Sequence, residues 1–377
     1  MPHAVFHQPY RLFFIGAGFH AVLSMLAWAL HLLFGQSFVP DISYLWHGYE
    51  MLFGYAVAVI TGFILTAAEN WTGRRTVNTA VLVGLFLFWM LARFSTMLGG
   101  PGWLTLLGDG MVLLGLTVAL SRVLWLTGNR RNLRFVPICA LLMLAALVYH
   151  ASALGILPEW RLSILHLATD LVLILMVVMG GRVIPFFTQR RLPNLSVEDP
   201  DWLGFYTGFL VVLSVLLSWL IPGSLAAMAS WFAGCFLMAR LFYWSPLGTW
   251  REPMLWILHL GYFWLGIALF LRGGAMAWNW MPLGDTLHAV TIGGMGCLTL
   301  GMMARVSMGH GGHEIRAPWW LVPAFALVAV AAIPRLLAAW PALLSPTITH
   351  GFSASLWILS FLVFALGFLP ILLKDRN

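Results

Sequence analysis

The sequence has very few charged residues. Asp, Glu, Lys and Arg fill 9% of its 377 positions, and Lys374 is its only lysine. Soluble domains carry about 25% charged residues, whereas this chain is 61% hydrophobic. So few charges cannot cover a water-facing surface of this size. The composition excludes a soluble enzyme, a nucleic-acid-binding module and a disordered scaffold, and it predicts a protein embedded in membrane lipid.

Cysteine motifs are also missing. Cys139, Cys235 and Cys297 are scattered through apolar runs. Without a C-x-x-C pair the sequence encodes no zinc ribbon or thioredoxin-type site, and without C-x-x-C-H it encodes no covalently attached c-type haem. The sequence likewise lacks a phosphate-binding or dinucleotide-binding glycine loop. This excludes ATP-driven transport encoded in this chain.

Long apolar runs take the place of these features. A membrane-spanning helix needs about 20 apolar residues, and the sequence contains about twelve such runs with short connections. We therefore predict an all-α polytopic membrane protein, with a single integral membrane domain over residues 1–377. The expected spans are 11–34, 47–69, 77–98, 103–126, 134–156, 162–187, 201–220, 224–244, 253–271, 283–306, 318–340 and 349–373.

Arginine placement predicts the orientation of these spans. Nearly all arginines flank one side of the expected bundle, and only Arg161 and Arg272 lie clearly on the other. Because loops rich in positive charge stay inside, we expect both termini to lie in the cytoplasm.

Twelve histidines stand out in a chain with so few polar residues. Neutral imidazole is a common ligand of haem iron and copper. His47, His166 and His288 lie near the outer starts of the second, sixth and tenth expected helices, 119 and then 122 residues apart. His31 and His150 are also 119 residues apart. The spacing indicates three pseudo-repeated arcs of four helices, over residues 1–130, 131–250 and 251–377.

Such a repeat would bring the histidines of equivalent helices to one depth. We predict that His47 and His288 bind a haem in the outer half of the membrane. Glu50 and Asp285 each lie three residues from one of these histidines. They are expected to orient the ligand rings or to carry protons.

Other polar residues inside the expected spans are also candidates, because ionisable groups at such depth are costly. His259 and His20 form the competing pair for a second haem. Arg93 and Arg335 are candidates for binding haem propionates, and the alternative for both is a snorkelling side chain or a structural ion pair. Asp109 is a further intramembrane charge.

A copper site is predicted around His166. Asp170 follows it by one helical turn and can hold the ring through its second N–H group. His150 and His31, at outer helix ends, are the expected partner ligands.

Several stretches together resemble a known family. They are Trp46-His47-x-x-Glu50-Met51-Leu52-Phe53-Gly54-Tyr55, Gly62-Phe63-x-Leu65-Thr66-Ala67, Asn70-Trp71-Thr72-Gly73-Arg74, Gly180-Gly181-Arg182-Val183-Ile184-Pro185-x-Phe187-Thr188, Leu258-His259-Leu260-Gly261-Tyr262, Leu287-His288-Ala289 and Gly301-Met302-Met303-x-Arg305-x-Ser307-x-Gly309-His310. The combination, spread over most of the chain, resembles the NnrS family of haem- and copper-containing membrane proteins.

The resemblance implies twelve spans, haem b, copper and a role in the bacterial response to nitric oxide, in the inner (cytoplasmic) membrane. His47, His259, His288 and His310 fall within the matching motifs. The resemblance leaves open which histidines bind iron, which bind copper, what donates electrons and whether there is enzymatic turnover.

The architecture is also similar to that of the catalytic subunit of haem–copper oxidases. The sequence departs from that pattern in three places. The span 201–220 has no histidine, no second histidine follows His288 by two residues, and no tyrosine follows His166 by four. The leading hypothesis is therefore binding or detoxification of nitric oxide. A respiratory oxidase or reductase, and a proton- or metal-coupled transporter, are the alternatives.

Overall fold

The computed structural model describes residues 4–374, and the regular elements of this part of the chain are all helices, joined by loops, without a strand. Eleven helices are long and apolar enough to cross a membrane, and one further apolar helix is shorter. The prediction of an all-α polytopic membrane protein is confirmed. The helices are α1 (Pro9–Phe34), α2 (Tyr44–Tyr49), α3 (Val57–Thr72), α4 (Thr79–Met97), α5 (Gly102–Leu126), α6 (Phe135–Ala153), α7 (Arg161–Arg191), α8 (Asp201–Leu220), α9 (Ser224–Tyr243), α10 (Pro253–Trp278), α11 (Leu283–His288), α12 (Cys297–His310), α13 (Leu321–Leu337) and α14 (Pro346–Leu373).

Two spans change from α-helix to π-helix and back. The segment η2 (Glu50–Ala56) joins α2 to α3, and η6 (Ala289–Gly296) joins α11 to α12. Short π-helical segments are rare and are often found at functional sites. Both of them begin within three residues of a histidine that we predict to bind haem, His47 and His288 respectively.

Local signals explain where the helix that carries His47 begins. The hydroxyl of Ser43 accepts a hydrogen bond from the backbone N–H of Trp46 at 3.2 Å, which caps α2. The preceding helix α1 ends at Gly35, whose φ of 67° is the left-handed conformation that glycine adopts at little cost. The turn between α1 and α2 is therefore fixed at both of its ends.

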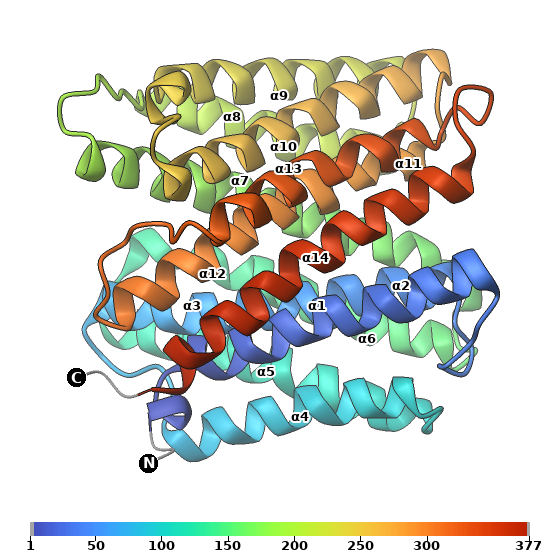
Figure 1. Ribbon diagram of the computed structural model, residues 1–377, viewed down its shortest axis with the longest axis horizontal. Coiled ribbons are helices and arrows are strands. Elements are labelled where there is room, and N and C mark those ends of the chain that lie inside the picture. Colours follow the sequence, from blue (N-terminus) through green and yellow to red (C-terminus); the bar gives the residue numbers. More distant parts are fainter. Residues whose placement is uncertain (1–3, 375–377) are drawn as a thin grey trace. The chain divides into compact units, whose positions relative to one another are not determined.

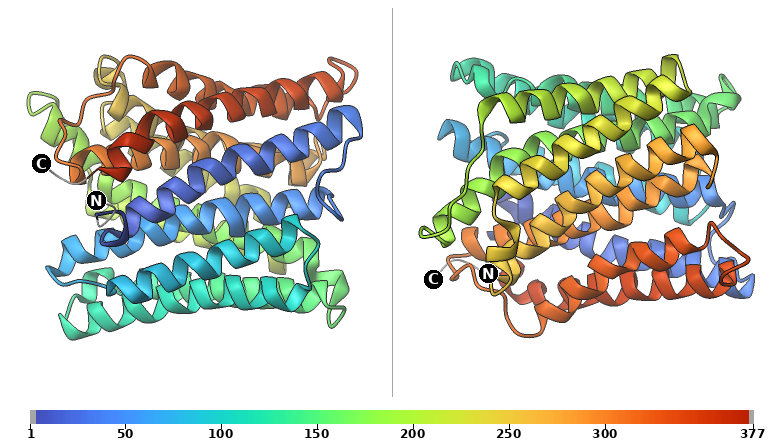
Figure 2. Two further views of the ribbon diagram at one scale, coloured as in Figure 1. Left: turned by 60° about the horizontal axis from the view of Figure 1, so that its bottom comes forward. Right: turned by 90° about the horizontal axis from the view of Figure 1, so that it is seen from above.

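The chain forms two compact units. The first comprises Met1–Leu171, Met303–Glu314 and Phe361–Asn377, and the second comprises Val172–Met302 and Ile315–Ser360. In the first unit α4 and α5 form an antiparallel pair, and α5 also packs against α3 and α6 (Figure 1; Figure 2, left). In the second unit α9 packs against α8 and α10, and η6 packs against α10 and α13 (Figure 2, right). A single domain with three internal repeats stays a prediction.

A close approach between α4 and α5 positions the site described next. A Cβ atom on Gly108 of α5 would lie only 2.8 Å from the Cβ of Ala92 on α4. Glycine therefore lets the two backbones come together, as small residues do between membrane helices. The neighbours of these two residues, Asp109 and Arg93, are brought face to face as a result.

Candidate functional site

Five ionisable side chains from five segments are gathered inside the first unit. We call this group the buried charge network: His20 on α1, Glu50 on η2, Arg93 on α4, Asp109 on α5 and His150 on α6. None of them is more than 4% exposed. Ionisable residues are rare inside membrane proteins and usually mark a functional region when they occur.

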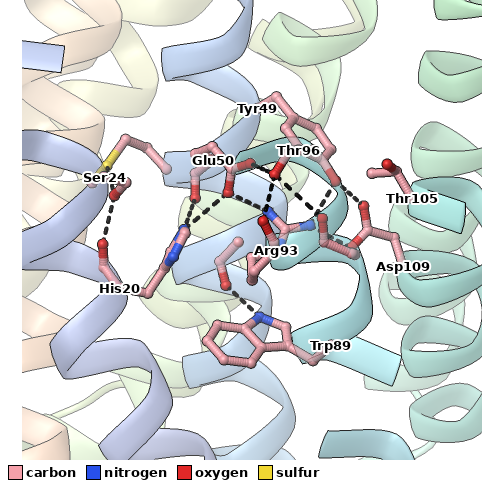
Figure 3. A network of polar contacts seen from close by, with 12 residues as sticks. His20, Ser24, Tyr49, Glu50, Trp89, Arg93, Thr96, Thr105 and Asp109 are labelled. Atoms are coloured by element: carbon pink, nitrogen blue, oxygen red, sulfur yellow. Dashed lines mark hydrogen bonds and ion pairs between the residues drawn. The ribbon is translucent and has the colours of Figure 1, made fainter. Parts of the chain in front are cut away.

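Arg93 is at the centre of the buried charge network (Figure 3). Its Nη1 donates to Oε2 of Glu50 at 2.5 Å, and its Nη2 donates to Oδ1 of Asp109 at 2.7 Å. Nη2 also donates to the hydroxyl of Tyr49 at 2.6 Å, and that hydroxyl donates to Oδ2 of Asp109. Both carboxylates therefore contact the same guanidinium, which offsets the cost of burying them.

The two histidines extend this network in opposite directions. Nε2 of His20 lies 3.0 Å from Oε2 of Glu50, and Nε2 of His150 lies 3.0 Å from Oδ2 of Asp109. Thr96 completes the set because its hydroxyl donates to Oε1 of Glu50 at 2.5 Å. A continuous series of polar contacts thus runs from α1 to α6.

The π-helical segment η2 allows these side chains to come so close. A Cβ atom on Gly54 would lie 2.7 Å from Nη1 of Arg93 and 2.8 Å from Oε2 of Glu50, and it would also collide with the ring of His20. The carbonyl of Gly54 accepts a hydrogen bond from Nε1 of Trp89 at 2.9 Å (Figure 3). Glycine is therefore required at this position by the space that the network occupies.

The predicted haem ligand His47 lies beside this network, at the start of the broken span. It is half-buried, and its ring stacks on Trp28 with 5.0 Å between the ring centroids and 11° between the planes. Trp28 also stacks with His31, at 5.7 Å. Nδ1 of His31 is 3.0 Å from the hydroxyl of Ser37. The aromatic contact fixes the face of the His47 ring.

The second unit contains the other predicted haem ligand. His288 is half-buried at the end of α11, directly before η6. Asp285, three residues earlier, accepts a hydrogen bond from Nη2 of Arg335 on α13 at 2.8 Å. His259 on α10 is buried, with Nδ1 at 3.0 Å from the carbonyl of Leu255. The Asp285–Arg335 pair thus lies close to His288 in sequence, as Glu50 and Arg93 do for His47.

The residues predicted to bind copper are placed differently. His166 is half-buried on α7, and Asp170 is buried one turn later on the same helix. His150 and His31 have the contacts given above. Among residues 4–374 no three side chains of His, Cys, Asp or Glu are gathered as a group able to hold a metal ion. The copper site stays a prediction without geometric support.

Sequence reasoning identified most of the charges in this region but not their partners. It expected Glu50 to orient His47, and for Arg93 it offered propionate binding, a snorkelling side chain or a structural ion pair. The structure joins Glu50, Arg93 and Asp109 to one another. Sequence reasoning missed Tyr49 altogether. The one sequence signal for these contacts was the presence of intramembrane charges of both signs, because each buried charge requires a partner.

The comparisons with known proteins agree with the motifs of the sequence. A family model described as NnrS protein matches residues 4–376, which is nearly the whole chain. No curated protein matches.

Proposed function

The chain belongs to the NnrS family, and from this membership we propose that it is a haem b and copper membrane protein that acts in the response to nitric oxide. Nitric oxide is an apolar gas that concentrates in lipid and binds both iron and copper. The observation that carries the proposal is the placement of His47 and His288. Each is a half-buried imidazole at a helix turn that runs into a π-helical segment.

The chemistry of His47 and His288 suits a haem. Imidazole is an axial ligand of haem iron, and both histidines lie on helices, where a ring can be held in one orientation. Haem, when bound, supplies a redox-active iron. We propose that His47 and His288 hold it, with Glu50 and Asp285 fixing the segments that carry them. His259 and His20 are the candidate ligands we propose for a second haem.

A copper site is the second part of the proposal. His166 would be its first ligand, held through Asp170, with His150 and His31 as partners. Nε2 of His150 is already in contact with Asp109. Copper binding at His150 would therefore require that contact to change. The location we propose is the bacterial inner membrane, with both termini in the cytoplasm, as the arginines indicate.

The proposal is tested on the full-length protein purified in detergent. Pyridine haemochrome and metal analysis give the content of haem and copper, and optical titration of the reduced protein with nitric oxide gives binding. We expect a red protein whose haem is lost in His47→Ala and in His288→Ala. The matched control is His313→Ala, since His313 lies exposed in the loop after α12. Haem retained in full by both variants would disprove the ligand assignment, and a colourless protein would disprove the function.

The buried charge network favours a second candidate, a proton-coupled transporter. Chains of acidic residues and histidines inside a membrane protein form proton relays. This network gathers such residues from four helices and η2, with Arg93 between the two carboxylates. A transporter needs no haem. A colourless purified protein that moves protons into vesicles, and loses this activity in Glu50→Gln, would favour transport over the haem proposal.

A further inference from the structure

An arginine follows each of the two predicted haem ligands at nearly the same distance in sequence. Arg93 is 46 residues after His47, and Arg335 is 47 residues after His288. Each arginine lies near the end of the span that follows the π-broken one, on α4 and α13 respectively. Each binds a carboxylate three residues from the histidine. An arginine–carboxylate pair thus lies near a predicted haem ligand in each unit, with the carboxylate after the histidine in the first and before it in the second.

In the first unit the arginine holds the turn that follows His47. Arg93 donates to the carboxylate of Glu50 and to the hydroxyl of Tyr49, which are the third and second residues after the histidine. Its guanidinium also lies over the Tyr49 ring, 4.8 Å from the centroid. The first turn of η2 therefore has little freedom to rotate, and neither does the turn of α2 that carries His47.

In the second unit the arginine holds the turn before His288. Helix α11 has only six residues, and Asp285 is the one that Arg335 binds. His350 of α14 lies within electrostatic range of both partners. The side chains of Arg335 and Asp285 keep 17% and 20% of their surface exposed. The Arg335–Asp285 pair can therefore be substituted with less damage to the fold than the buried Arg93–Glu50 pair.

The helix that carries the predicted copper ligand His166 lacks both the π-helical segment and the arginine at this distance in sequence. Helix α7, which carries His166, is α-helical from Arg161 to Arg191 with no π-helical segment. The residues 46 and 47 positions after His166 are Val212 and Leu213, so no arginine is available at the equivalent place. A π-helical segment and an arginine 46 or 47 residues after the histidine thus accompany the two predicted iron ligands.

We propose that Arg93 and Arg335 are positioning residues for the haem ligands, a role that rests on the proposed function. Each binds a carboxylate three residues from its histidine and thereby holds the backbone turn that carries the imidazole. Groups that orient a metal ligand typically change affinity about 10- to 100-fold when they are removed. The role differs from binding of propionates, because the arginine acts through the carboxylate and not on the haem.

The test uses Arg335→Gln in the full-length protein, with Arg335→Lys as the conservative variant and Arg251→Gln as the control. Arg251 is exposed in the loop before α10. Haem content is measured by pyridine haemochrome, haem loss by transfer to an apoprotein acceptor, and ring orientation by the g values of the low-spin EPR signal. We expect Arg335→Gln to bind haem with shifted g values and about 10-fold faster loss. Arg335→Lys should restore both toward wild type, and Asp285→Asn should reproduce the Gln variant.

Three outcomes would overturn the proposal. Unchanged g values and unchanged haem loss in Arg335→Gln would show that the arginine does not position the ligand. Reduced haem content with an unchanged signal from the remaining haem, and no restoration by Lys, would show a role in folding alone. A shift in Arg335→Gln that Asp285→Asn does not reproduce would show that the arginine acts on the haem itself. If the wild-type protein holds no haem, the proposed function fails first and this inference fails with it.

Discussion

Nη1 of Arg93 and Oε2 of Glu50 lie 2.5 Å apart, and both side chains are almost completely shielded from solvent. A buried ion pair of this kind contributes little net stability compared with apolar packing, but removal of one partner is costly. The second carboxylate on the same guanidinium, Asp109, raises that cost further. Arg93 therefore joins three spans, which also meet through the Thr96–Glu50, Tyr49–Asp109 and Trp89–Gly54 hydrogen bonds.

We expect Arg93→Met to lower the stability of the protein by about 3–5 kcal/mol, because it leaves two carboxylates buried without their cation. Thermal unfolding in detergent, compared with Arg122→Met, measures the loss. Arg122 is exposed on α5 and is the matched control. The triple variant Glu50→Gln, Arg93→Met, Asp109→Asn should recover much of the loss. An Arg93→Met variant as stable as the control would contradict the ion-pair account.

The second prediction concerns Gly54. Alanine there places a Cβ within 2.7–2.8 Å of Arg93 and Glu50, and overpacking of this kind costs about 1–3 kcal/mol. Gly84→Ala on α4 is the control, because nothing lies within 4 Å of the new Cβ and alanine favours a helix by about 1 kcal/mol. We expect the melting temperature to fall for Gly54→Ala and to stay level or rise for Gly84→Ala. Equal melting temperatures for the two variants would be inconsistent with the close packing around η2.

Two of the expected spans show how far the sequence predicts the fold. The span expected at 201–220 is α8 to the residue, because a helix in lipid must satisfy its own backbone and therefore follows the apolar run. The span expected at 318–340 is shorter: α13 begins at Leu321 and ends at Leu337, three residues after Pro334. Among the expected spans within residues 4–374, it alone does not reach the length of a full span.

The site is less predictable than the spans. A π-helical segment inserts one residue into a helix and has no composition that distinguishes it, so η2 and η6 were not foreseen. The carboxylate of Glu50 was placed near His47 by helical spacing, but its contacts with His20 and Arg93 depend on tertiary packing. Spacing along one helix predicts which residues share a face, whereas partners on other helices depend on how the helices pack.

A third prediction concerns the loop between α7 and α8 in the second unit. Arg240 binds both oxygens of Asp199 at 2.8 Å and also donates to the carbonyl of Gly181 at 3.0 Å. Nε1 of Trp244 donates to Asp199 at 3.2 Å. These bonds tie the loop to α7 and α9.

We expect Asp199→Asn to loosen this loop, because the amide cannot accept from both nitrogens of the guanidinium. Limited trypsin digestion should then cleave at Arg190 or Arg191 several-fold faster. Asp201→Asn is the control, since Asp201 is exposed at the start of α8. Equal cleavage rates in the two variants would show that the Asp199–Arg240 pair does not hold the loop.

The last prediction concerns which gas the protein reacts with. Reduction of oxygen by four electrons at a haem–copper centre uses a copper bound by adjacent histidines and a nearby tyrosine. The sequence has no histidine in α8, and valine and aspartate occupy the positions two after His288 and four after His166. Nitric oxide needs only one open coordination position on reduced iron or copper. A haem held by both His47 and His288 offers none, so a reactive site requires the copper or a five-coordinate second haem.

We expect the reduced protein to show an optical change with nitric oxide in stopped-flow titration and negligible oxygen uptake in an oxygen electrode. Uptake sustained near the roughly 10 turnovers per second typical of enzymes would favour a respiratory oxidase. Haem- and copper-loaded protein that shows no optical change with nitric oxide would favour a structural or transport role.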